Sequence, residues 1–308
     1  MNQLLALMQE DLHAGSLPVG LEDLVEALRQ QFGSSLQAVL LYGSCRRQHD
    51  AEEGLADLLV VVSSYREAYG QRLLAWMNRW LPPNVFYLES RREARVVRSK
   101  YAVITLDQFR RRCQARSDHY FWARFCQPMR LAFGTAEVVG PLAEARALAA
   151  INYAARIAPL IQHEVSADDF WETALATTYR CELRPEPPDN AARVIGNDPE
   201  FWPRLTEALA ETLDSLAPGG SGFITIATAG QRRRARSMWR LRAVTGKLFN
   251  LARLLKAAGT FSNGIDYIAW KVERHSGVRV EPTETMRRYP RLAAWGLVWR
   301  MWRQGGFK

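Results

Sequence analysis

Cysteine is scarce in this 308-residue sequence, and its four copies lie far apart. No two of them form a CxxC pair, and the five histidines show no spacing typical of metal ligands. This pattern argues against a disulfide framework and against a zinc site, so we expect a reducing compartment. The four cysteines are Cys45, Cys113, Cys126 and Cys181.

Long apolar runs are also missing. No stretch approaches the roughly 20 apolar residues that a membrane-spanning helix needs. The N-terminal segment MNQLLALMQEDLHAG has no positively charged start of the kind found in secretory signals, and it predicts a short amphipathic helix. We therefore expect a cytoplasmic protein whose contact with a membrane is peripheral.

Acidic residues are too few to balance the basic ones. Lysine and arginine number 41 against 32 acids, which gives a net charge of +9. Any one basic run could be a solvated helix face, but together they indicate a polyanionic partner such as a nucleotide, a nucleic acid or an acidic lipid. Arginine is concentrated over 91–98, 110–116, 232–242 and 287–303.

Short apolar runs alternate with helical patterns in the first part of the chain, which predicts an α+β fold with a small mixed sheet. We predict helices over 21–32, 65–80 and 106–126, and strands over 36–42, 55–62, 84–88, 94–106 and 128–134.

The rest of the chain predicts mainly helical units. A helical domain, with a winged-helix-like arrangement as one option, is expected over 138–217, after a sheet domain over 1–137. The Pro-Gly-Gly-Ser-Gly stretch at 218–222 predicts a linker. A basic helical region over 218–308, facing a membrane, is expected to follow it.

One constellation carries the chemistry. Tyr42-Gly43-Ser44 ends an apolar strand, and Asp57 lies on the next one. Polymerase-β-like nucleotidyltransferases build their site this way: glycine and serine cradle a triphosphate, and an acid on the adjacent strand holds Mg²⁺ against it. A tight turn beside a strand-end aspartate is the structural alternative. The usual second acid, two residues after the first, is Leu59 here, so either the protein is a degenerate binder or the remaining acid comes from elsewhere in the chain.

Several further segments resemble the mitochondrial-type phosphatidate cytidylyltransferases and their bacterial relatives, the translocator assembly and maintenance family. The family's single-acid strand and KYGV segment are similar to Asp57 and SKYAVI at 99–104. The resemblance continues, in the same order, in FWARFCQPM at 121–129, TYRCELR at 178–184, and ATAG at 227–230 with Arg236-Ser237. This chain departs from the family pattern at Ala123, Cys126, Glu182 (usually Asp) and Arg236 (usually Lys).

The resemblance implies transfer of CMP from CTP to phosphatidic acid, with Mg²⁺ as cofactor. It implies that Asp57 and Glu182 hold the metal from two domains, with Lys100 as a catalytic contact to phosphate. Tyr42, Gly43 and Ser44 are then expected at the nucleotide. Further nucleotide contacts are expected from Arg184, Arg193, Arg236 and Ser237.

Each of these residues has a simpler role open to it. Glu182 could pair locally with Arg180 or Arg184, Lys100 could lie at a sheet edge with its amine in solvent, and the arginines could be surface charge.

The C-terminal segment over 286–308 combines tryptophan and arginine. Trp295, Trp299 and Trp302 share one helix face, and Arg300 and Arg303 flank them. This composition predicts an interfacial helix, on the inner face of the cell membrane if the substrate is phosphatidic acid. A helix that docks on the core by its tryptophans is the alternative.

The sequence thus favours a phosphatidate cytidylyltransferase that needs no nucleic acid partner and could be a homodimer. Two other hypotheses stay open: a nucleotidyltransferase with another acceptor, such as RNA or a small molecule, and a non-catalytic membrane adaptor on a decayed transferase fold.

Overall fold

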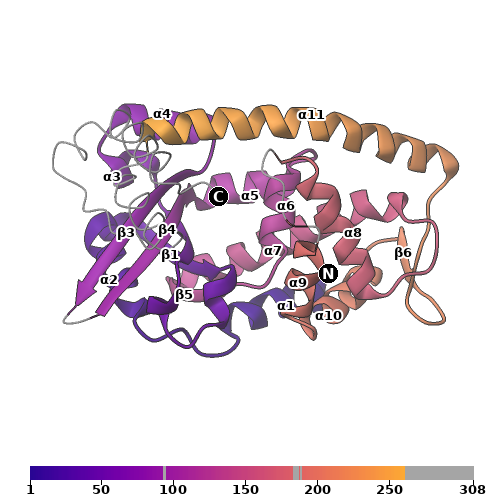
Figure 1. The fold of residues 1–308 in the computed structure, drawn as a ribbon, viewed down its shortest axis with the longest axis horizontal. Coiled ribbons are helices and arrows are strands. Elements are labelled where there is room, and N and C mark those ends of the chain that lie inside the picture. Colours follow the sequence, from indigo (N-terminus) through magenta and orange to yellow (C-terminus); the bar gives the residue numbers. More distant parts are fainter. Residues whose placement is uncertain (93–94, 183–186, 188, 261–308) are drawn as a thin grey trace, which may run out of the picture.

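The computed structural model describes residues 1–92, 95–182, 187 and 189–260 (Figure 1). The fold is α+β, as predicted, and its centre is a mixed sheet in the order β3-β4-β2-β1-β5. β2 and β4 are parallel, and the other neighbouring strands are antiparallel. The strands are β1 (Leu36–Tyr42), β2 (Ala56–Val62), β3 (Asn84–Arg92), β4 (Arg95–Thr105) and β5 (Arg130–Gly134).

Both faces of the sheet are covered, which explains why β1 and β2 are almost continuously apolar. Leu40 and Leu59 point to one face, and Leu41 and Leu58 to the other. The second face packs against α2 (Leu21–Phe32), α3 (Tyr65–Tyr69) and α4 (Arg72–Trp80). The first face packs against α1 (Asn2–His13), α5 (Leu106–Gln114), α6 (His119–Phe125) and α7 (Ala136–Ile157).

The single helix predicted over 65–80 is wrong, because the structure has two. α3 ends at Gly70, whose φ of 61° is a left-handed conformation that glycine adopts at little cost. The chain restarts as α4 two residues later. The helix predicted over 106–126 is likewise divided, into α5 and α6, where Asp118 caps the second helix by accepting from the Phe121 N–H.

The helical part of the chain shares one core with the sheet. α8 (Ala167–Tyr179), α9 (Asn190–Gly196) and α10 (Phe201–Ala210) bring Phe170 and Trp202 into the cluster that also contains Leu40 and Leu59. Within this core, Arg146 of α7 is fully buried and pairs with Asp11 of α1 at 2.5 Å. Through this ion pair α7, which begins at Ala136, ties the helical part of the chain to α1.

The glycine-rich stretch predicted as a linker is instead the turn of a hairpin. β6 (Leu216–Pro218) and β7 (Phe223–Thr225) are antiparallel, and the Gly219 N–H donates to the Gly222 carbonyl across the turn. Phe223 also exchanges backbone hydrogen bonds with Val165, which fixes the hairpin to the helical part.

The last described element, α11 (Ala229–Thr260), is a long helix that crosses the molecule from the hairpin to α4 (Figure 1). It leaves one side exposed along much of its length, and its other side covers α6 and the end of β3. None of the described helices combines the length and the apolar character needed to cross a bilayer.

Candidate functional site

A row of polar side chains crosses the sheet where β1 ends and β2 begins. Tyr42 of β1 pairs with Asp57 of β2, Asp57 pairs with Lys100 of β4, and Lys100 pairs with Tyr87 of β3. Side chains of directly paired residues lie on the same face of a sheet. The register therefore places a carboxylate, an amine and two phenols side by side, at one end of an otherwise apolar face.

Gly43 shapes the end of β1 next to this row. Its φ of 75° lies in the left-handed region, and a Cβ at this position would meet Asp57 Oδ2 at 3.0 Å. Any other residue would be strained there and would crowd the carboxylate. Gly43 and Ser44 are both exposed, so their polar groups at the strand end are open to a ligand.

Lys100 and Asp57 form an ion pair. Lys100 Nζ lies 3.1 Å from Asp57 Oδ1. Burial lowers the pKa of Lys100, but the Asp57 carboxylate and Tyr42 together outweigh it, and the pKa of the amine is raised above its ordinary value. Lys100 is thus a fixed positive charge at neutral pH. Burial also raises the pKa of Tyr42 to about 12, so this phenol stays protonated.

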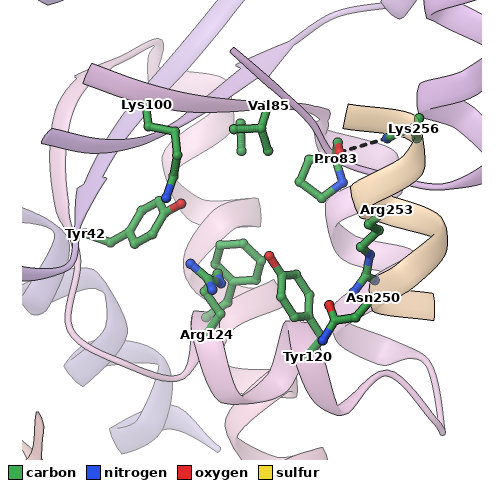
Figure 2. Close-up of a pocket in the computed structure, with 11 residues that line it drawn as sticks. Tyr42, Pro83, Val85, Lys100, Tyr120, Arg124, Asn250, Arg253 and Lys256 are labelled. Atoms are coloured by element: carbon green, nitrogen blue, oxygen red, sulfur yellow. Dashed lines mark hydrogen bonds between the residues drawn. The ribbon is translucent and has the colours of Figure 1, made fainter. Parts of the chain in front are cut away.

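A cavity of about 270 Å³ opens beside the row (Figure 2). Tyr42 and Lys100, the register neighbours of Asp57, form one wall, and Tyr120 and Arg124 of α6 form another. Figure 2 shows Lys100, Tyr42 and Arg124 pointing toward one another.

Arg124 is the central charge of this wall. Its guanidinium lies 4.9 Å from the centre of the Tyr120 ring and 5.5 Å from that of Tyr42. Tyr120 contributes most to raising its pKa, and the carboxylates of Asp57 and Glu182 raise it further. Among the described residues, none accepts a hydrogen bond from its buried Nε. Arg124 thus lies within the electrostatic range of both predicted acids and keeps donor capacity for a ligand.

α11 closes the cavity with residues far away in the sequence. Asn250, Arg253 and Lys256 line it. Arg253 lies 4.2 Å from the centre of the Tyr120 ring, and Lys256 Nζ donates to the carbonyls of Leu81 and Pro83, the latter at 2.9 Å. Burial, together with nearby Arg253 and Arg112, lowers the pKa of Lys256 to about 7.

Comparison with known proteins assigns no family to the chain. No family model matches it, and no curated protein matches it.

The structure gathers part of the predicted site. Tyr42, Gly43, Asp57 and Lys100 lie together at one end of the sheet, with Ser44 in the turn that follows. Glu182 lines a neighbouring cavity of about 330 Å³, which shares Tyr120, Asn250 and Arg253 with the first.

Other predicted residues lie elsewhere. Arg193 of α9 is exposed and donates a hydrogen bond to the Asn190 side chain. Its charge helps to lower the pKa of Arg47, which lies in the turn that begins at Ser44. Arg236 and Ser237 are exposed on α11, about 21 Å along the helix axis before Asn250 at 1.5 Å per residue. The structure does not bring these two to the cavity. Arg184 and the C-terminal residues Trp295, Trp299, Trp302, Arg300 and Arg303 lie outside the described residues.

The sequence prediction missed Tyr120, Arg124, Arg253 and Lys256. Arg124 had a signal of its own, since it is a charge inside the aromatic helix HYFWARF that otherwise packs into the core. Arg253 and Lys256 had none, because they belong to a helix whose many basic residues look alike in sequence.

Asp57 offers a fit for one Mg²⁺ ligand. Its Oδ1 pairs with Lys100 and its Oδ2 lies beside Gly43, so this strand-end carboxylate can offer one oxygen to a metal that takes one or two carboxylates and completes its shell with phosphate oxygens and water. Within the part of the chain that the structure describes, no three His, Cys, Asp or Glu side chains gather into a larger metal cluster. Any metal here would thus depend on Asp57 and on the phosphates themselves, with Glu182 as the nearest predicted addition.

Proposed function

We propose that this protein is a nucleotidyltransferase that transfers CMP from CTP to phosphatidic acid, releasing pyrophosphate and forming CDP-diacylglycerol. The observation that carries the proposal is the row of Tyr42, Asp57 and Lys100 beside Gly43, of which Tyr42 and Lys100 line a cavity with Arg124 and Arg253. It combines a metal-binding acid, a backbone that comes close to its ligand, and cations for a triphosphate.

The topology supports the proposal. β1 and β2 are antiparallel neighbours joined through the Gly-Ser turn, and β4 is parallel to β2 on its other side. This is the arrangement expected of a polymerase-β-like nucleotidyltransferase sheet, with the acid-bearing strand in the middle.

Charge and shape explain how such a site could work. An oxygen of the acceptor phosphate attacks the α-phosphorus of CTP, and the bond to pyrophosphate breaks. Since the nucleophile is already ionised, catalysis needs positioning and charge neutralisation more than a base. Lys100, Arg124 and Arg253 are placed to neutralise phosphate oxygens, and Asn250 has the donor and acceptor groups that a nucleobase edge requires. Mg²⁺, held by Asp57, would add further neutralisation of the triphosphate.

An exposed surface on α4 and α11 supports a lipid acceptor. Leu241, Val244, Leu248 and Leu251 follow one another at helical spacing on α11 and are 48–62% exposed. Leu73, Trp76 and Trp80 of α4 are 59–70% exposed. Lys256 joins the two helices through the carbonyls that follow α4. α11 has nine basic residues and no acid, a composition typical of contact with an anionic bilayer.

A transfer assay tests the proposal. Purified protein, CTP labelled at the α-phosphate, Mg²⁺ and phosphatidic acid vesicles should yield label in the lipid phase. Asp57→Asn should lower the rate by about 10²-fold or more, because it removes charge at the metal position. Asp214→Asn, which changes an exposed aspartate outside the cavity, should leave it unchanged.

The other outcomes separate the alternatives. Label that enters RNA and not lipid would favour a different acceptor, for which the exposed arginines of α11 are also suited. No transfer and no CTP binding would favour a non-catalytic adaptor.

A further inference from the structure

The second cavity is lined by basic and apolar residues, among them Arg242 and Leu241, that have no role in the proposed nucleotide site. It measures about 330 Å³ and lies between α6, Glu182 and the middle of α11. Its base is basic and its mouth is apolar. It shares Tyr120, Asn250 and Arg253 with the first cavity, so a ligand in one would adjoin a ligand in the other.

The base of the cavity holds polar groups whose hydrogen-bonding capacity is not used. Arg242 is only 6% exposed and lies 4.9 Å from the centre of the Trp239 ring. For its Nε, for Arg253 Nε and for His119 Nδ1, all buried, no acceptor or donor lies within reach among the described residues. Buried polar atoms normally have partners, so three without one at a single cavity indicate a ligand that supplies them.

Among the residues that the structure describes, three arginines and two acids line this cavity, so the arginines outnumber the acids. Asp118 is occupied, because it pairs with Arg112 at 2.9 Å and caps α6. Glu182 acts on Arg124, whose pKa it helps to raise. Arg242 donates one hydrogen bond to the Arg116 carbonyl at 3.2 Å, and together with Arg253 it contributes a guanidinium group to the cavity lining. Guanidinium is the group best matched to a phosphate monoester.

The mouth of the cavity is apolar. Met238, Leu241 and Phe249 line it and are 38%, 55% and 58% exposed. Leu241 also begins the exposed stripe of α11 that continues through Val244 and Leu248. A ligand with a phosphate head and an apolar tail would match both ends of this surface at once.

We propose that the second cavity binds the phosphate of an amphiphilic monoester, with the phosphate at Arg242 and Arg253 and the tail against Met238, Leu241 and Phe249. That this ligand is the acceptor of the transfer rests on the proposed function, whereas the binding itself does not. The shared wall of Tyr120 and Arg253 would place the acceptor phosphate next to the nucleotide.

Substitutions of Thr245 can separate the effect of an added charge on ligand binding from the effect of a larger side chain. It lines the cavity from α11 and is partly exposed, so longer side chains can be accommodated there without disturbing the core. Thr245→Glu places a carboxylate among the arginines, and Thr245→Gln adds the same bulk without charge. Both are good helix formers.

The experiment is calorimetric titration of the full chain, without CTP, with three probes: monomeric dioctanoyl phosphatidic acid, glycerol 3-phosphate and dioctanoylglycerol. We expect dioctanoyl phosphatidic acid to bind about tenfold more tightly than glycerol 3-phosphate, because its tails bury apolar surface. Dioctanoylglycerol should bind more weakly than the phosphatidic acid. Thr245→Glu should weaken both phosphate probes about tenfold or more, and Thr245→Gln by less than about twofold.

Several results would overturn the proposal. Equal binding of dioctanoylglycerol and phosphatidic acid would mean an apolar cavity without a phosphate site. Equal losses in the two Thr245 variants, or no loss in either, would remove the charge argument. A preference for glycerol 3-phosphate would mean a free phosphate ester rather than a lipid.

These titrations, read beside a CTP titration and the transfer assay, distinguish failure of this site from failure of the proposed function. Lipid binding that is sensitive to Thr245→Glu, in a protein that does not bind CTP, would keep the second site and reject the transferase. Asp57-dependent transfer, with lipid binding insensitive to Thr245→Glu, would do the reverse.

Discussion

The sheet end and α11 both contribute to the first cavity, but they do so by different means. In the sheet, Asp57 and Lys100 are fixed by strand register and paired with each other at 3.1 Å. In α11, Arg253 is placed over an aromatic ring, and the helix has no acid to pair with its nine basic residues. The sheet thus supplies a rigid, nearly neutral centre, and the helix supplies excess positive charge for a ligand.

This difference predicts that substitutions in the sheet row affect the chemical step most, and that substitutions in α11 affect ligand binding. The predictions below test this division, beginning with the largest expected effect.

Lys100→Met should lower the transfer rate by about 10²-fold to 10³-fold, because it removes a fixed charge beside the reacting phosphates and leaves Asp57 without its ion-pair partner. The measurement is kcat with labelled CTP and phosphatidic acid vesicles. Lys247→Met, a change of an exposed lysine on α11, is the matched control and should retain most activity. A similar loss in both variants would contradict a special role for the sheet row.

Gly43→Ala should lower the rate by about tenfold or more and reduce the free energy of unfolding by about 1–2 kcal/mol. The added Cβ would adopt a left-handed conformation 3.0 Å from Asp57 Oδ2. Rate assays and urea denaturation measure the two effects. Gly140→Ala, at a helical position of α7 with open space around it, should be neutral or slightly stabilising. If Gly43→Ala behaves like that control, the strand end does not constrain the carboxylate.

Arg253→Lys should raise the Kd for CTP by about fivefold to tenfold with a smaller change in kcat. Lysine keeps the charge but loses the planar stacking on Tyr120 and the forked donors. Calorimetric titration with CTP measures this Kd, and the transfer assay measures kcat. The exposed Arg240, changed to Lys in the same helix, should give wild-type affinity. A loss confined to kcat would contradict the division between helix and sheet.

Lys256 should give the smallest effect, a change in how stability depends on pH. Its pKa is about 7 in the folded chain against an ordinary value of 10.5, so over this interval the unfolded chain binds the extra proton. Stability attributable to Lys256 therefore rises as the pH rises from about 7 toward 10.5. Denaturation of wild type and Lys256→Met at several pH values should show the stability of the wild type rising, relative to that of the variant, between about pH 7 and pH 10.5. Parallel curves would show that this lysine is not tuned by burial.

The sheet was more predictable than the site. Apolar runs such as 36–42 marked strands correctly because burial on both faces needs continuous apolar residues. The helix over 65–80 was mispredicted because one glycine in the left-handed conformation divides it. The hairpin at 216–225 was missed because glycine-rich composition suits a linker and a tight turn equally, and backbone hydrogen bonds decide between them.

Within the site, sequence spacing predicted that Gly43 and Asp57 lie close together, because the two strands that carry them are consecutive in the sequence and adjacent in the sheet. It could not predict that Lys256 contacts the carbonyls of Leu81 and Pro83, or that Arg253 stacks on Tyr120, since periodicity gives the face of a helix and not its partner. It also did not separate Arg253 from Arg236, although they lie at opposite parts of the same helix.

The most direct test of the central claim is calorimetric titration of CTP into the wild type, Asp57→Asn and Asp214→Asn, each with and without Mg²⁺. If the row at the sheet end is a nucleotide site, the wild type and Asp214→Asn should bind CTP with an affinity that Mg²⁺ increases, and Asp57→Asn should lose this Mg²⁺ effect. An Mg²⁺-dependent affinity that survives in Asp57→Asn, or no CTP binding by the wild type, would contradict it.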